Sequence, residues 1–231
     1  MPRALHCPAA GAGQGRARRT PGQMDFKKIT DEVSKKMLSY SQDTSGWRVI
    51  KVSKNVTVSS KPSKEYAGHL YRGEGIIKEV PSKVIPFMYL PEHRSKWDKA
   101  LQSYRLLEKI DQDTGIYHSV TQSYGMGVIS SRDFVDVVHI KPYAGGILTT
   151  NSVSVEYPEC PPSPSCIRGH NNPCGYVCSP LPENPEHSKL VVFIQPELGG
   201  ILPHSVVETA LPTILINLIT DTRAGLKALN K

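Results

Sequence analysis

The last 30 residues, LPHSVVETALPTILINLITDTRAGLKALNK, carry the pattern that most constrains how the rest of the chain folds. Their apolar residues recur at spacings of three and four, which is typical of a helix with one buried face. Pro203 is placed to begin this helix and Pro212 to kink it. The apolar face is broader than a coiled-coil seam, so we expect it to cover another layer, through Val206, Val207, Ala210, Leu211, Ile214, Leu215, Leu218 and Ile219.

Another amphipathic helix is predicted directly after Met24. It ends at the polar residues 43–46, and its apolar stripe consists of Phe26, Ile29, Val33, Met37 and Tyr40. The segments WRVIKVS and NVTVSSKP then alternate around Lys54 and Asn55, which predicts a β-hairpin. A third strand, GHLYRGEGII, contains glycines that indicate bends or close backbone approaches.

The remaining middle of the chain is mainly strand-like. Pro81 to Leu90 is predicted as a short helix opened by proline, and RSKWDKAL follows as a turn or a further short helix. Six strands separated by turns or proline-rich loops follow between Tyr104 and Leu198, which favours an antiparallel meander. The predicted fold is therefore α+β, a curved nine-stranded antiparallel sheet closed by the C-terminal helix. A ligand cavity and a solidly packed core both fit this pattern.

Composition limits the class of protein. The net charge of the 231 residues is +7, but residues 1–23 contain four arginines and no acid, which leaves 7 − 4 = +3 for the rest. This balance is too small to argue for nucleic acid, and it suits loose contact with anionic membrane surfaces. The chain has no apolar run of the length that crosses a bilayer and no secretory h-region. Five cysteines without close pairing indicate reduced thiols in a cytoplasmic protein.

The segment 1–23, MPRALHCPAAGAGQGRARRTPGQ, is rich in Gly, Pro and Arg and has no periodicity. We expect it to be a disordered extension, with one folded domain over residues 24–231. It lacks acids, as organelle transit peptides do, but it also lacks serine and an amphipathic helix. Organelle targeting is therefore the less favoured interpretation.

The stretch CIRGHNNPCGYVCSP places Cys166, His170, Cys174 and Cys178 four residues apart. The proline and glycine at its centre disfavour a helix, and on one strand neighbours four apart lie about 13 Å from each other. Zinc ligands lie about 2.0–2.3 Å from the metal, so a single strand cannot assemble these four. We expect a strand with an irregularity at its proline, and no metal.

For the other notable polar residues we predict structural rather than catalytic roles. Arg132 and Asp133 are adjacent at a strand start, and we expect an ion pair that ties a loop to the sheet, because an isolated carboxylate lacks a partner for acid–base catalysis. His118 and His139 are expected on a sheet face or at the surface. The chain contains no nucleophile-elbow motif and no phosphate-cradling glycine motif. These patterns predict no catalytic residue and no cofactor.

The segments LYRGEGII, KWDKAL, SSRDFVDVVHI, CIRGHNNPCGYVCSP and LGGILPHSVVETALP together resemble the START domain, the StAR-related lipid-transfer family. The likeness runs from about Met24 to Leu229 and is closest to the small, soluble, stand-alone members. It implies a helix-grip fold, in which the sheet surrounds a tunnel bordered by an Ω-like loop, here residues 123–131. It also implies extraction, shielding and delivery of one lipid.

Sterol-binding members of this family often carry an acidic residue and an arginine that face the tunnel. Matched by distance from the RDF motif, these positions are Ser119 and Val138 here, so a buried charge pair is not expected. Hydroxyls such as Ser119 and Thr121 are the expected polar anchors. Sterols, steroids and bile-acid-like lipids remain open, and tight recognition of a ligand charge is not favoured. The predicted ligand-binding residues are Ser119, Thr121, Tyr124, Met126, Val138, Val207, Leu211, Ile214 and Leu218.

The predicted function is non-vesicular lipid transport by a monomer, with the lipid as partner and transient contact with membranes. Met126, Val128 and Ile129 are expected to touch the bilayer when the loop and the C-terminal helix open. Two alternatives use the same cavity. One is a ligand-sensing or partner-binding module, and the other, less favoured, is an enzyme.

Overall fold

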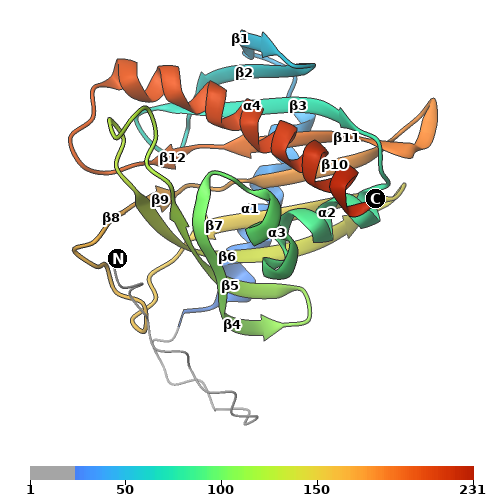
Figure 1. The fold of residues 1–231 in the computed structure, drawn as a ribbon. Helices are drawn as coiled ribbons and strands as arrows, with labels where there is room; N and C mark the ends of the chain where they lie inside the picture. The colour runs from blue at the N-terminus through green and yellow to red at the C-terminus, as the bar shows by residue number, and fades with distance from the viewer. Residues whose placement is uncertain (1–23) are drawn as a thin grey trace.

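The computed structural model describes residues 24–231 (Figure 1). Its helices are α1 (Phe26–Gln42), α2 (Pro81–Tyr89), α3 (Pro91–Trp97) and α4 (His204–Leu229). Its strands are β1 (Arg48–Ser53), β2 (Val56–Pro62), β3 (His69–Ile77), β4 (Leu101–Asp111), β5 (Thr114–Thr121), β6 (Arg132–Tyr143), β7 (Ile147–Ser154), β8 (Ile167–Arg168), β9 (His170–Asn171), β10 (Gly175–Leu181), β11 (Asn184–Ile194) and β12 (Pro196–Glu197).

One curved sheet forms the body of the protein, with strand order β1-β2-β3-β11-β10-β7-β6-β5-β4. These nine strands pair antiparallel, and the link between β3 and β11 joins the N-terminal strands to the later meander. The prediction of a nine-stranded antiparallel sheet with a long C-terminal helix is confirmed. Two pairings were not predicted. The short strand β8 pairs in parallel with β6, and β9 and β12 form a separate two-stranded antiparallel sheet.

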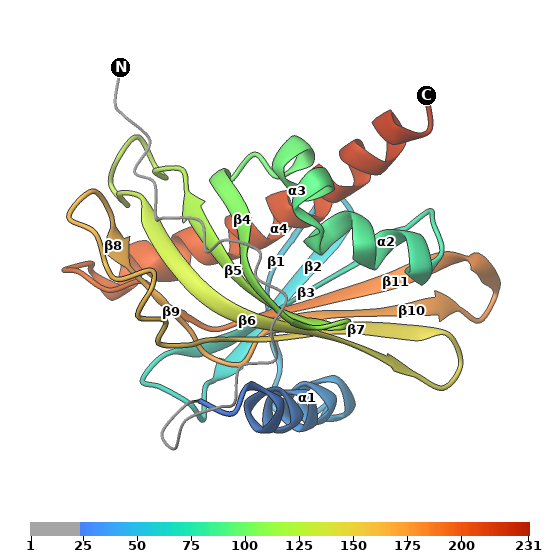
Figure 2. The same ribbon diagram turned by 90° about the horizontal axis from the view of Figure 1, so that it is seen from below.

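Helices cover both faces of the sheet. Figure 2 shows α1 beneath the sheet and α2, α3 and α4 on the other side, across the concave face. The α1 residues Val33 and Met37 are buried against Phe193 and its neighbours on the convex face. Asp25 caps α1 by accepting a hydrogen bond from the backbone N–H of Lys28 at 3.2 Å. Within residues 24–231, no helix is long and apolar enough to cross a membrane.

The turn between β1 and β2 has the backbone predicted for it. Lys54 and Asn55 both have positive φ, at 53° and 57°. Two consecutive residues in this region make the tight turn whose twist matches the flanking strands. Asn adopts this conformation more easily than most residues, and the hairpin prediction around these two residues is confirmed.

The stretch 166–180 is not one strand, which corrects the expectation stated above. It divides into β8, β9 and β10, and Cys166 and Cys174 lie outside all three. At the break, Gly175 has φ +147°, and a β-carbon there would lie 2.0 Å from the carbonyl oxygen of Thr150. This close backbone approach excludes a regular strand with a side chain at that position. Among residues 24–231, no group of three or more His, Cys, Asp or Glu side chains is placed to hold a metal ion.

Helix α4 lies unusually close to β3. A β-carbon at Gly73 would lie 2.7 Å from Cγ of Leu215, so the missing side chain is what lets the helix reach the sheet. Further along α4, Arg223 donates hydrogen bonds to the carbonyl oxygens of Ile76, Lys54 and Asn55 at 2.8–3.0 Å. The C-terminal half of α4 is therefore fixed to β3 and to the β1–β2 turn.

We expect Gly73→Val to lower the free energy of unfolding by about 1–3 kcal/mol, because the new side chain overpacks the helix–sheet contact. Urea unfolding measures this change. In a Leu215→Ala background, where the opposing side chain is smaller, Gly73→Val should cost much less. An equal cost in both backgrounds would contradict the steric explanation.

Candidate functional site

A cavity of about 600 Å³ lies between the concave face of the sheet and α4. Strands β5 and β6 supply much of its wall through alternate residues. Ser119 and Thr121 on β5 line it, as do Phe134 and Val138 on β6. The intervening β6 residues point the other way, because side chains alternate along a strand, and they pack with Phe26 on the convex face.

Seven of the nine predicted ligand-binding residues line this cavity: Ser119, Thr121, Tyr124, Val138, Leu211, Ile214 and Leu218. The other two lie elsewhere. Met126 is fully exposed on the loop between β5 and β6. Val207 lines a separate pocket of about 170 Å³ beneath the first turns of α4. The structure thus gathers the predicted β5, β6 and mid-α4 residues around one space and leaves the loop methionine outside it.

The cavity also contains charged residues, which corrects the expectation of a tunnel without a buried charge pair. Arg94 on α3 forms an ion pair with Asp98 at 3.2 Å, and both line the cavity. Asp136 on β6 lines it as well and lies within the electrostatic influence of Arg94. The matched positions Ser119 and Val138 are uncharged, but acidic and basic groups reach the same space from other positions.

Asp136 is the most distinctive polar group of the wall. One carboxylate oxygen accepts a hydrogen bond from Ser154 Oγ at 2.6 Å and the other accepts from Asn171 Nδ2 at 2.8 Å. Burial raises the pKa of Asp136, and these two hydrogen bonds oppose the rise. Part of its surface is nevertheless open, so the carboxyl is accessible from the cavity that it lines.

Tyr104 on β4 supplies a second polar group. Its ring stacks on Tyr117 with centroids 5.2 Å apart, and the Arg94 guanidinium lies 4.4 Å from its centroid. The residue is 8% exposed, and its hydroxyl oxygen interacts with the Arg94 guanidinium, but among the described residues no group accepts a hydrogen bond from this hydroxyl. Burial also raises the pKa of Tyr104, so the phenol keeps its proton and can donate it.

Sequence reasoning missed Arg94, Tyr104 and Asp136. Asp136 could have been found, because it lies two residues before Val138 and so shares its face of β6. Arg94 and Asp98 are four residues apart in a segment of mixed charge, which indicates a pair but not where it points. The place of Tyr104 depends on how β4 meets α3, and no local pattern shows that.

The loop 123–131 borders the cavity beside the segment that leads into α4. Gly125, Met126 and Gly127 all have positive φ, and backbone hydrogen bonds join Tyr124 to Ile129 across the loop. Ile129 is consequently buried and lines the cavity. In this structure Ile129 therefore faces the cavity and is not at the surface of the loop.

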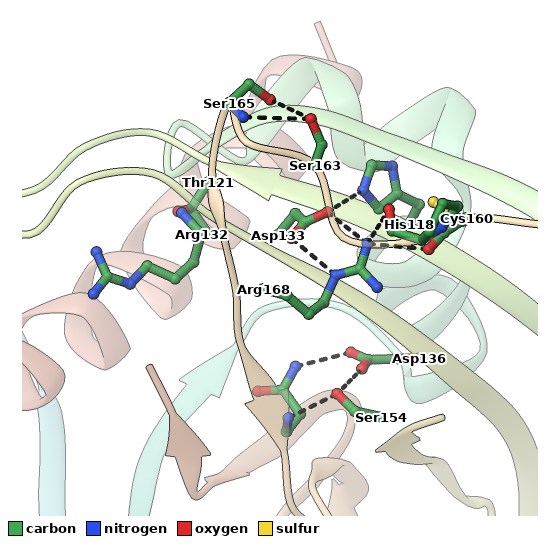
Figure 3. Close-up of polar contacts among 12 residues, drawn as sticks. His118, Thr121, Arg132, Asp133, Asp136, Ser154, Cys160, Ser163, Ser165 and Arg168 are labelled. Carbon is green, nitrogen blue, oxygen red and sulfur yellow. Dashed lines mark hydrogen bonds and ion pairs between the residues drawn. The ribbon is translucent and has the colours of Figure 1, made fainter. Parts of the chain in front are cut away.

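Arg132 connects the two segments at this border. Its guanidinium donates to the carbonyl oxygens of Ser130, Leu198 and Gly199 at 2.8–2.9 Å. It does not pair with Asp133, which corrects the predicted ion pair. Figure 3 shows the two side chains pointing in opposite directions. The loop 123–131 and the segment before α4 are instead held together through one arginine.

Asp133 has different partners on the convex face. Its carboxylate accepts two hydrogen bonds from Arg168 and one from His118 Nε2, all at 2.9 Å (Figure 3). His118 is thus buried in an ion-pair cluster, and the expectation of a surface or simple sheet-face histidine misses this role. Hydrogen bonds from His118 and Arg168 lower the pKa of Asp133 to about 2, although burial opposes them. We call Asp133, His118 and Arg168 the convex cluster.

The sequence model of the START domain matches residues 15–231. The chain belongs to the START domain family. This START domain is 50% identical to human StAR-related lipid transfer protein 6 over 205 residues, which is 89% of this chain and 93% of that protein. It is 36% identical to StAR-related lipid transfer protein 5 of Bos taurus, over 86% of this chain and 94% of that protein. The solved structure of human StAR-related lipid transfer protein 5 aligns with a TM-score of 0.84 at 36% identity, over 89% of this chain and 98% of the other.

Proposed function

We propose that this START domain binds one sterol- or steroid-like lipid in the cavity under α4 and carries it between membranes. The observation that carries this proposal is the cavity itself. About 600 Å³ of space lies between sheet and helix, within the range of small-molecule sites, and leucine, isoleucine, valine and aromatic side chains form much of its wall. Relatives of 50% and 36% identity are named as lipid transfer proteins.

Closing such a cavity around a lipid makes transport through water possible. Apolar surface removed from water is worth about 25 cal/mol per Å², so an unshielded lipid leaves a bilayer slowly. A protein that offers an apolar interior at the membrane surface lowers this barrier. We propose binding and release without a catalytic step. In support, both oxygens of Asp136 already accept hydrogen bonds from the protein, and Arg94 is paired with Asp98.

We propose that the cavity opens at the N-terminal end of α4. The C-terminal half of this helix is held by Arg223 and by its contact at Gly73. The first turns, from His204 to Thr209, are half-buried or exposed. Pro212 lies between the two parts and supplies no backbone N–H for the carbonyl of Glu208. An opening of the first turns would therefore leave the packing of the C-terminal half unchanged.

Filling the cavity tests the proposal. We expect Ser119→Trp combined with Val138→Trp to reduce one-to-one lipid capture at least tenfold, because the two indoles would occupy the space of the lipid. Native mass spectrometry of protein purified from cells, followed by lipid extraction, measures capture and identifies the lipid. The control Ser103→Trp introduces an indole at an exposed position of β4 and should leave capture unchanged. An unliganded wild-type protein, or full capture by the filled variant, would refute the proposal.

The rate of sterol transfer between vesicles distinguishes a carrier from a sensor. A carrier accelerates transfer of a fluorescent sterol such as dehydroergosterol between two vesicle populations in proportion to its concentration. A sensor binds the sterol without that acceleration. We propose the monomer as the working unit, in the reducing interior of the cell, where thiols such as those of Cys166, Cys174 and Cys178 stay reduced.

A further inference from the structure

Arg94, Asp98 and Asp136 lie together at one end of the cavity, which we call its polar end. Arg94 and Asp98 neutralise each other in an ion pair at 3.2 Å. Asp136 faces the same space, and no cation among residues 24–231 forms a salt bridge with it; its partners are the neutral side chains of Ser154 and Asn171. Ionised Asp136 therefore leaves this end of the cavity with a net negative charge, and protonated Asp136 leaves it neutral. In neither state is a positive charge left over.

The other charged residues of the wall do not change this balance. Arg132 lies four residues from Asp136 on β6, about 13 Å along an extended strand, and its guanidinium is occupied by loop carbonyls. Lys54 and Lys99 are exposed, and Asp221 accepts a hydrogen bond from the backbone of Lys99. Solvent therefore screens the charges of the two exposed lysines.

Tyr104 marks the position of a ligand group. A buried hydroxyl hydrogen without an acceptor is uncommon in native proteins and indicates that something outside the protein accepts it. The Tyr104 hydroxyl can donate to a ligand oxygen, and Arg94 lies beside it with further N–H groups. A hydroxyl hydrogen on the ligand could in turn reach the Asp136 carboxylate, which has lone pairs left over.

We infer that this end of the cavity, formed by Arg94, Tyr104 and Asp136, accepts an uncharged ligand oxygen, a hydroxyl or a ketone, and rejects a carboxylate. The inference rests on the proposed function, since it names the chemical class of lipid that the same cavity takes. A neutral oxygen completes the hydrogen bond of Tyr104 at no electrostatic cost. A carboxylate would bring a second negative charge beside Asp136, with no unpaired cation to balance it. Bile acids and fatty acids are therefore excluded as preferred ligands.

The first test compares two lipids that share one ring system, 5β-cholan-24-ol and 5β-cholan-24-oate, by competition against dehydroergosterol at pH 7.4. We expect the wild-type protein to bind the alcohol at least tenfold more tightly than the carboxylate. Equal or tighter binding of the carboxylate would overturn the inference. Binding of neither compound, with no lipid on the purified protein, would instead overturn the proposed function on which it rests.

The second test removes the charge. Asp136→Asn should tighten binding of the carboxylate about tenfold and so reduce the measured preference for the alcohol over the carboxylate. Asp31→Asn removes the same charge from the exposed side of α1 and should change neither. If Asp136→Asn fails to fold, Tyr104→Phe serves in its place, because it removes only the hydroxyl that donates to the ligand. Tyr104→Phe should weaken binding of the alcohol about fivefold. An unchanged affinity for the alcohol would count against the inference.

Discussion

Replacing Met126, Val128 and Ile201 with aspartate is expected to slow sterol transfer between vesicles about 100-fold while the free energy of unfolding stays nearly unchanged. The three side chains are 105%, 62% and 102% exposed, so the folded protein loses almost no packing without them. Burying one such side chain in an apolar environment is worth about 1.5–3 kcal/mol, so three of them are enough to hold a loop end in a bilayer. Aspartate carries a charge that an apolar layer excludes.

The positions of the three residues make them a membrane contact rather than scattered surface apolar groups. Met126 and Val128 belong to the loop 123–131, and Ile201 belongs to the segment before α4. Arg132 binds carbonyl oxygens of both segments, and Figures 1 and 2 place both at the same end of the molecule. This is also the end at which we propose that α4 opens. Bilayer contact and exit of the lipid would therefore occur at one place.

A matched control uses apolar residues at the other edge of the sheet. Val49 and Val52 on β1 are 59% and 66% exposed, and β1 stands at the opposite end of the strand order from β4 and β5. Changing both to aspartate alters charge and apolar surface in the same sense, but away from the loop 123–131 and the segment before α4. Transfer of dehydroergosterol should then persist at the wild-type rate. Equal slowing by both sets of changes would show a nonspecific charge effect and would refute the assigned contact surface.

Ile201 was missed and Ile129 misplaced because backbone conformation, and not composition, decides which of them is exposed. Both residues are apolar and lie within two residues of a glycine, so local composition does not distinguish them. The difference arises from hydrogen bonds between Tyr124 and Ile129, which fold the loop back and bury the isoleucine. Ile201 follows Gly199 and Gly200, both with positive φ, in a segment held by Arg132 from another strand. Such contacts between distant segments leave no periodic signal in the chain.

The fold was more predictable than the polar chemistry of the site, for a physical reason. Apolar periodicity reports which face of each element is buried, and it placed α1, the β1–β2 hairpin and the wide face of α4. Ser119 and Val138 were placed on one wall by the resemblance to START domains, through their distance from the RDF motif, and the structure has both at the cavity. A charged residue at a cavity contradicts the rule that buried positions are apolar. Arg94 and Asp136 are tolerated only because Asp98, Ser154 and Asn171 satisfy them, and these partners come from separate elements.

The convex cluster carries the largest stability effect that we expect from a single substitution. Asp133→Asn should lower the free energy of unfolding by about 3–5 kcal/mol, because it leaves a half-buried guanidinium without its carboxylate. The Asp133 side chain is 3% exposed, and its bidentate contact with Arg168 is reinforced by His118. Arg168 also donates to the carbonyl oxygens of Cys160 and Pro161, so the same substitution should loosen the proline-rich loop that precedes β8.

The stability that ionised Asp133 contributes should decrease as the pH falls. The pKa of Asp133 in the folded protein is lowered to about 2, and the unfolded value is about 3.9. A lowered folded pKa contributes stability that is fully present above pH 4 and is lost as the pH falls toward 2. Urea unfolding of the wild-type protein should therefore show a decline in stability over this window. Asp133→Asn should show a smaller decline, since the group that titrates is gone.

A double substitution separates the ion pair from a general disturbance of the sheet. Arg168→Met removes the cation and keeps an apolar stem of similar length. Combined with Asp133→Asn, it removes the unpaired charge, and replacing both members of a buried pair is often close to neutral. The double variant should therefore be more stable than Asp133→Asn alone, and hydrogen exchange should show partial recovery of the loop before β8. If Asp133→Asn costs less than about 0.5 kcal/mol, as exposed substitutions do, then β8 is held to β6 by its backbone pairing rather than by this cluster.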